Sequence, residues 1–336
     1  MSGPLVTVLM SVHNGEAYLS EAVESILSQT HQNFEFLIVN DASTDRSASI
    51  LVEYQDARIR IIRNEHNLGL TRSLNKGLAQ VKGKYVARMD ADDVSYPLRL
   101  ERQVTFMEQH PEVGLCGTWG KLLGLKDKYN RTFPTNNNEL QVSLLCYNPF
   151  IHPSVVLRSD VLRALDKPYD QRFRYAQDYE LWTRVAERSE ITNLPETLVG
   201  YRVHEGQISS HRRQEQDQCV TQVVQTQLKK LGIEASPQEA RFARHVLSRS
   251  FPYQATEAVQ RAHEGLLQLK AANERTPRYH PLAFRQYLDE SWAQLIANLH
   301  QPTKETKKLV QISPFRIYRS LTIRERVRLF TKLAFL

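Results

Sequence analysis

The chain has 336 residues, of which 41% are hydrophobic and 24% are charged, enough to bury one large core or two smaller ones. Its three cysteines, Cys116, Cys146 and Cys219, are too widely spaced for a disulfide framework or a zinc cluster, so we expect a reducing, cytoplasmic environment. The amino terminus lacks a signal-peptide pattern and no apolar run reaches membrane-spanning length. We therefore expect no transmembrane segment.

The formal net charge of +7 is concentrated in residues 301–336, which hold nine basic and two acidic residues interleaved with large apolar ones. Because the rest of the chain is close to neutral, we expect no nucleic-acid partner. The segment suits a basic amphipathic helix lying on an anionic membrane surface, at the inner face of the cell membrane. It suits equally well a terminal helix that packs on its own domain and leaves a solvated basic face.

Strand-like and helix-like segments alternate through the first ninety residues. Apolar and β-branched runs predict strands at Val6–Val12, Phe34–Val39, Arg60–Arg63 and Tyr85–Met89. Apolar residues at helical spacing predict helices at Ala17–Leu27, through Ile50, Leu51 and Tyr54, and at Leu70–Ala79. Such alternation predicts an α/β fold with a doubly wound parallel sheet, which binds ligands at the carboxyl ends of its strands.

The fourth predicted strand ends in an acidic cluster, Asp90-Ala91-Asp92-Asp93. Three carboxylates in four residues at the end of a buried strand are costly unless a cation neutralises them. At this edge of the sheet the cluster predicts a divalent metal ion that holds a diphosphate. The alternative is a solvated acidic turn before Pro97.

Other loops should reach the same edge. They are 12–16, 40–43 and 63–70, and the last offers amides, including Asn67, and a turn glycine that suit hydrogen bonding to a base or ribose. No glycine-rich dinucleotide motif and no P-loop occurs, so the metal ion must supply the phosphate contact.

Four segments together resemble the family 2 inverting glycosyltransferases, which have the GT-A fold. They are 8–15, 36–45, 67–70 and 88–93, in the family's order. The resemblance implies a mostly parallel sheet flanked by helices, a nucleotide-diphospho-sugar donor, usually a UDP-sugar, and a Mn²⁺ or Mg²⁺ ion. It also implies that Asp41 accepts a hydrogen bond from the nucleobase, that Asp90 lies by the ribose and that Asp92 ligates the metal. The chain departs from the family's Ala-Arg-Asn triplet, having Ser73-Leu74-Asn75.

Two of the donor-site assignments have structural alternatives. Asp41 could instead cap or shape a turn, as could Asp45, and Asn14 could line the nucleoside pocket or only shape its loop.

Asp178 is the candidate general base, because an inverting transfer needs one carboxylate to deprotonate the acceptor hydroxyl. It lies at the start of a predicted helix, where the family commonly has an acidic pair whose second member is the base; Gln177 replaces the first member. The alternative is a helix N-cap. Glu180 competes for the role, but it would face away from Asp178 on a helix.

His204, in a further family-like segment, is the candidate second metal ligand beside Asp92. A histidine at the end of a strand can equally be held by an ordinary hydrogen bond.

The second half of the chain changes character. Helical spacing predicts helices at Gln214–Leu231, Pro237–Ser250, Thr256–Leu269 and Phe284–Leu299. We therefore divide the chain into a GT-A domain at 1–210, an α-helical extension at 211–300 and a basic amphipathic tail at 301–336.

The sequence favours a soluble enzyme that adds one sugar to a saccharide or lipid-linked saccharide acceptor, since it lacks the membrane spans and the Gln-x-x-Arg-Trp signature of processive synthases. Two other functions remain open: a sugar nucleotidyltransferase, which would need a glycine-rich basic loop after its first strand, and a noncatalytic membrane-surface binding protein, which would leave the carboxylates without a role.

Overall fold

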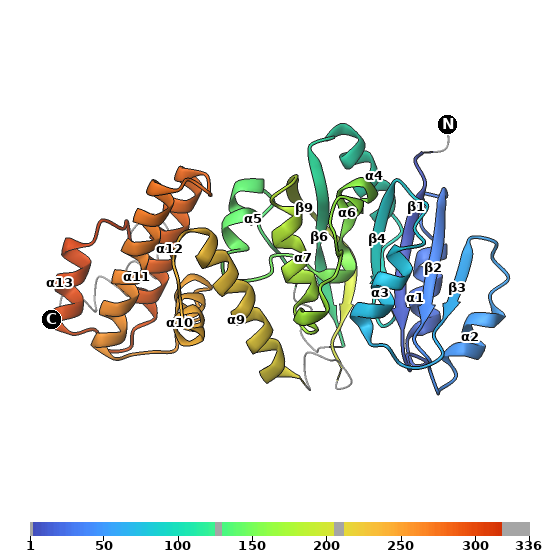
Figure 1. Ribbon diagram of the computed structural model, residues 1–336, viewed down its shortest axis with the longest axis horizontal. Coiled ribbons are helices and arrows are strands. Elements are labelled where there is room, and N and C mark those ends of the chain that lie inside the picture. Colours follow the sequence, from blue (N-terminus) through green and yellow to red (C-terminus); the bar gives the residue numbers. More distant parts are fainter. Residues whose placement is uncertain (1–2, 125–129, 205–211, 318–336) are drawn as a thin grey trace. The chain divides into compact units, whose positions relative to one another are not determined.

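The computed structural model describes residues 3–124, 130–204 and 212–317 (Figure 1). Chain contacts divide it into two compact units: residues 1–140 with 148–219, and residues 141–147 with 220–336. Among the described residues, no helix is both long enough and apolar enough to cross a bilayer.

In its described residues, the first unit contains a nine-stranded sheet whose main path runs in the order β3-β2-β1-β4-β8-β6-β9-β5, with β7 paired to β6. Its strands are β1 (Val6–Val12), β2 (Phe34–Asn40), β3 (Ile59–Arg63), β4 (Tyr85–Asp90), β5 (Val94–Ser95), β6 (Val113–Leu123), β7 (Asn130–Arg131), β8 (Val156–Arg158) and β9 (Glu190–Arg202). The first four strands pair in parallel, whereas β8 runs antiparallel to β4 and β6. The predicted α/β fold with helices flanking the sheet is confirmed.

Helices connect these strands. They are α1 (Leu19–Leu27), α2 (Ser47–Glu53), α3 (Leu70–Leu78), α4 (Arg99–Gln109), α5 (Asn137–Ser143), α6 (Ser159–Arg163), α7 (Gln177–Val185) and the short 3-10 helices η1 (His152–Ser154) and η2 (Gln171–Phe173). The predicted elements of the first ninety residues match the observed ones closely, because each carries a clear strand or helix period.

The two faces of β4 pack against different partners, because successive side chains of a strand point to opposite faces. Tyr85, Ala87 and Met89 belong to one buried cluster with apolar side chains of α1 and α4. Arg88 pairs in register with Leu9 of β1 and shares its face, and there Leu9 contacts α3 so closely that a Cβ on Gly77 would lie 2.4 Å from Leu9 Cδ1. The α3 face of β4 therefore carries Arg88 and Asp90.

The second unit is helical, as predicted. Its helices are α9 (Arg213–Lys230, which begins in the first unit), α10 (Pro237–Leu247), α11 (Thr256–Arg275), α12 (Pro281–Asn298) and α13 (Lys304–Ile312). Phe315 and Ile317 are buried in the apolar core of this unit, so the first part of the predicted basic tail packs on its own domain. Residues 318–336, on which the membrane-surface prediction mainly rests, lie outside the described part of the chain.

Candidate functional site

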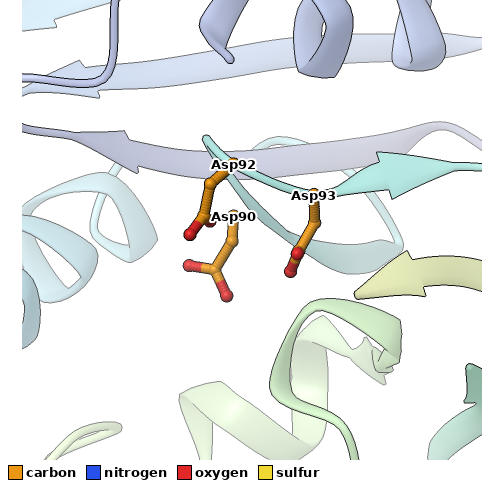
Figure 2. Close-up of side chains that lie close together, drawn as sticks. All are labelled: Asp90, Asp92 and Asp93. Carbon is orange, nitrogen blue, oxygen red and sulfur yellow. The ribbon is translucent and has the colours of Figure 1, made fainter. Parts of the chain in front are cut away.

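Three carboxylate side chains meet where β4 ends. Asp90 is the last residue of β4, and Asp92 and Asp93 follow it in the turn before β5. One ligand atom from each lies within 4.8 Å of those of the other two, and Figure 2 shows the three carboxylates pointing to the same side of the turn. Asp93 is only 1% exposed, and its Oδ2 has no hydrogen-bond partner in the described residues. An orphaned carboxylate oxygen beside two other carboxylates fits a divalent cation.

Residues at and just after the end of β9 contact the acidic cluster. β5 pairs with β9 at Val94 and Gly200, which brings the residues after Gly200 next to the turn. The backbone N–H of Arg202 donates to Asp93 Oδ1 at 2.7 Å, and its Nε donates to the Asp92 carbonyl at 2.8 Å. His204 Nε2 lies 2.9 Å from Asp92 Oδ2, so the structure brings together the two predicted metal ligands.

The electrostatics of the acidic cluster also fit a cation. Burial raises the pKa of Asp93 well above its ordinary value, and the charges of Asp90 and Asp92 raise it further. Burial likewise raises the pKa of Asp90, against the lowering effect of the Arg88 guanidinium. A bound divalent ion would supply the missing positive charge and lower both pKa values.

Asp41 follows β2, is 2% exposed and is surrounded by hydrogen-bond donors. Its Oδ1 accepts hydrogen bonds from Asn64 Nδ2 and from the Leu68 N–H, and its Oδ2 accepts one from the Gly69 N–H, all at 2.8 Å. Its carboxylate therefore holds the loop before α3. Asp45, and not Asp41, makes the turn contact before α2, through Oδ1 and the N–H of Ser47.

Asn14 and Asn67 occupy loops at the same edge of the sheet. Asn14 adopts a positive φ of 52°, which asparagine tolerates better than most residues. Its Oδ1 accepts a hydrogen bond from the Thr44 N–H at 2.8 Å, which ties the loops after β1 and β2 together. Asn67 Oδ1 accepts a hydrogen bond from the N–H of Gly69 at 2.9 Å. Both side chains shape their loops, and the Gly69 N–H that Asn67 contacts also donates to Asp41.

Asp178 is the second residue of α7, so it lies within the first turn and not before it; the N-cap is Ala176. Its Oδ2 accepts a hydrogen bond from Asn148 Nδ2 at 2.7 Å. Burial raises its pKa; backbone N–H groups and the charge of Arg88 lower the pKa, and the charge of Asp90 raises it. The last two effects place Asp178 within electrostatic range of the acidic cluster.

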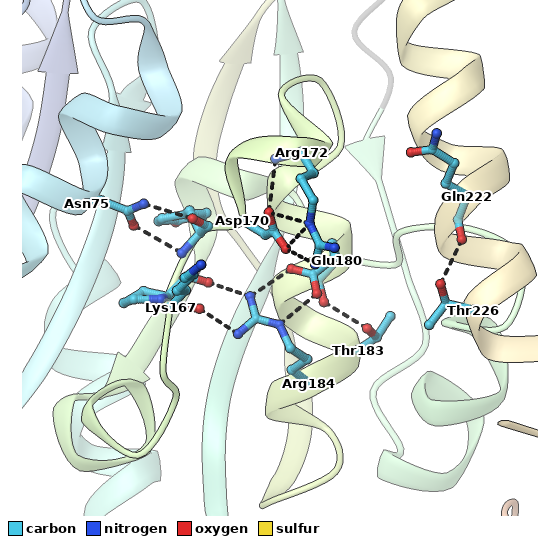
Figure 3. A network of polar contacts seen from close by, with 11 residues as sticks. Asn75, Lys167, Asp170, Arg172, Glu180, Thr183, Arg184, Gln222 and Thr226 are labelled. Atoms are coloured by element: carbon cyan, nitrogen blue, oxygen red, sulfur yellow. Dashed lines mark hydrogen bonds and ion pairs between the residues drawn. The ribbon is translucent and has the colours of Figure 1, made fainter.

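Glu180, the competing carboxylate, is bound to Arg184. Its two oxygens accept hydrogen bonds from Nε and Nη2 of Arg184, each at 2.7 Å. Arg184 also donates to the carbonyls of Lys167 and Pro168, and Asn75 pairs with the backbone of Tyr169. Figure 3 shows this network around the loop before η2. Glu180 and Arg184 therefore brace the loop.

Three residues near the site were not predicted from the sequence. Asn148 orients Asp178, Arg202 holds the turn of the acidic cluster, and Arg88 pairs with Asp90 through Nη2 and Oδ1 at 2.5 Å. The only signal for Arg88 was a charged residue inside an otherwise apolar strand, two positions before Asp90. The other two depend on contacts between segments far apart in the chain.

Comparisons with known proteins identify the family of the chain. The model of the family described as "Glycosyl transferase family 2" matches residues 7–164. An uncharacterized glycosyltransferase of Haemophilus influenzae is 35% identical over 69% of this chain and 76% of its own length. The O-antigen biosynthesis glycosyltransferase WbnJ of Escherichia coli is 32% identical over 60% of this chain and 80% of its own length.

Solved structures share the fold. S. aureus TarS in complex with UDP-GlcNAc superposes with a TM-score of 0.57 at 17% identity, over 93% of each chain. The mannosyltransferase PcManGT of Pyrobaculum calidifontis, in complex with GDP-Man and Mn²⁺, superposes with a TM-score of 0.56 at 17% identity, over 99% of this chain and 87% of its own.

The fold is that of the GT-A-type transferases. The chain belongs to glycosyltransferase family 2, as its sequence resemblance predicted, and is a glycosyltransferase.

Proposed function

We propose that the chain is a metal-dependent inverting transferase that moves one sugar from a nucleotide-diphospho-sugar, of the UDP class, to a hydroxyl of a saccharide or lipid-linked saccharide in cell-surface polysaccharide biosynthesis. The observation that carries the proposal is the acidic cluster at the end of β4, in a chain of this family. The nucleotide sugars bound in TarS and PcManGT support the donor class, and the O-antigen biosynthesis relative supports a role in polysaccharide biosynthesis.

Asp92 and His204 would hold the metal ion, Mn²⁺ or Mg²⁺, and the orphaned Oδ2 of Asp93 is a further ligand atom in reach of it. When bound, the ion would neutralise the charge of the donor diphosphate. Asn14, Asp41, Asn67 and Asp90 form the nucleotide side of the proposed site, where Asp41 also keeps the loop of Asn67 in place.

Asp178 would take the proton of the acceptor hydroxyl. The hydrogen bond from Asn148 Nδ2 to Oδ2 of Asp178 orients the carboxylate. Burial raises its pKa, and a raised pKa makes a carboxylate a stronger base while it is still ionised at neutral pH.

The pH dependence tests the role of Asp178. Only its ionised form can accept a proton, so kcat/KM should fall as the pH drops through its pKa, which lies above the ordinary value of 3.8 because of burial. At saturating Mn²⁺, we expect kcat/KM of the wild type to fall at a pH above that value. The residual kcat/KM of Asp178→Asn should show no such fall. An unchanged fall in that variant would assign the titration to another group.

The proposed function is tested with a panel of UDP-, GDP- and other nucleotide sugars. The protein is incubated with each donor and Mn²⁺, with and without a saccharide acceptor, and free nucleoside diphosphate is measured. We expect one donor to release diphosphate, faster with acceptor than by hydrolysis alone, and EDTA to suppress the release. Asp178→Asn protein purified in the same way controls for contaminating enzymes. Release of pyrophosphate, or of no product from any donor, would contradict the proposal.

A further inference from the structure

Arg88 is a charged side chain in the middle of a buried sheet. It lies on β4 between strands β1 and β8, on the face that α3 covers, and is 2% exposed. Removing a guanidinium from water costs free energy unless hydrogen bonds and an opposite charge compensate it. The groups that Arg88 contacts therefore indicate its role.

The guanidinium of Arg88 is only partly hydrogen-bonded. Arg88 Nη2 bonds the Asp90 carboxylate, while its Nε and Nη1 are buried without a hydrogen-bond partner in the described residues. Arg99, a second arginine without solvent exposure, bonds Gln103 and the carbonyls of Arg88 and Val155 through Nε and Nη2. Arg99 thus ties backbone segments together, whereas the contacts of Arg88 go to a site carboxylate.

We propose that Arg88 is a positioning residue of the transfer reaction: its guanidinium fixes the Asp90 carboxylate at the end of β4, on the nucleotide side of the proposed site. This inference rests on the proposed function. It gives Arg88 no contact with substrate, because its free N–H groups are buried.

The test is a double-mutant cycle in the donor assay. We expect Arg88→Met to lower kcat on the order of tenfold or more, and Arg88→Lys, which keeps the charge, to recover a large part of that loss. If Arg88 acts through Asp90, the same Arg88→Met change in an Asp90→Asn background should lower kcat by less than about threefold. Donor binding, measured by calorimetry with Mn²⁺, should weaken in Arg88→Met as it does in Asp90→Asn.

Arg99→Met is the matched control. It removes another buried arginine, so it should lower the melting temperature by a comparable amount, yet leave kcat of the folded protein within about threefold of wild type. Equal factors of kcat loss from Arg88→Met in both backgrounds, or a normal kcat in folded Arg88→Met, would overturn the inference. If Arg88→Met does not fold, an Arg88→Lys protein with a kcat no better than that of Asp90→Asn would overturn it as well. Wild-type protein inactive with every donor would instead refute the proposed function.

Discussion

Replacing Asp178 by asparagine should lower kcat by a factor on the order of a hundred or more while donor affinity stays within about threefold of wild type. The amide has the shape of the carboxylate and its oxygen can still accept the hydrogen bond from Asn148 Nδ2, but it cannot take a proton at neutral pH. The measurement is steady-state release of nucleoside diphosphate with donor and acceptor varied separately, together with calorimetric titration of the donor.

Glu180→Gln is the control for this prediction. Glu180 lies two residues further along α7 and is bound to Arg184, so the substitution should leave kcat close to that of wild type. The reverse outcome, an active Asp178→Asn protein and an inactive Glu180→Gln protein, would move the base to Glu180 and leave the fold assignment untouched.

Replacing Asp92 by alanine should abolish most of the metal-dependent donor affinity. Asp92 is the cluster carboxylate that His204 contacts, and removing this proposed ligand would take away both a bond to the ion and one negative charge. We expect the donor dissociation constant in Mn²⁺ to rise at least about tenfold, and to approach the value of wild-type protein in EDTA.

Asp166→Ala serves as the matched substitution for Asp92→Ala. Asp166 is an exposed aspartate outside the acidic cluster, so its loss changes the net charge equally but should leave the donor dissociation constant unchanged. If Asp92→Ala bound the donor as tightly as wild type, or if EDTA left the donor affinity of wild type unchanged, donor binding would not depend on a metal ion at this site.

The fold could be predicted wherever the spacing of apolar residues along the chain matches the period of a strand or a helix. The strands and helices of the first ninety residues, and helices α9 to α12, were placed to within a few residues at most of their ends, except that α11 continues to Arg275 beyond its predicted end at Leu269. Strands β5 and β8 contain two and three residues, too few for alternation to show. The long strands β6 and β9 pair with each other across about eighty residues of sequence, and such pairing is not a local property.

The candidate site divides in the same way. The family, the acidic cluster at the end of a strand, and the candidates Asp41, Asp178 and His204 could all be predicted from local sequence patterns, because such a pattern can be recognised without knowing which residues lie nearby in space. Tertiary structure alone decided that Asp41 holds the loop at 64–69 and that Asn148 orients Asp178. It also decided that Arg88 lies buried beside Asp90. These contacts join segments that are far apart in the sequence and meet only in the folded chain. Burial, which shifts the pKa values of the carboxylates, likewise exists only once the chain has folded.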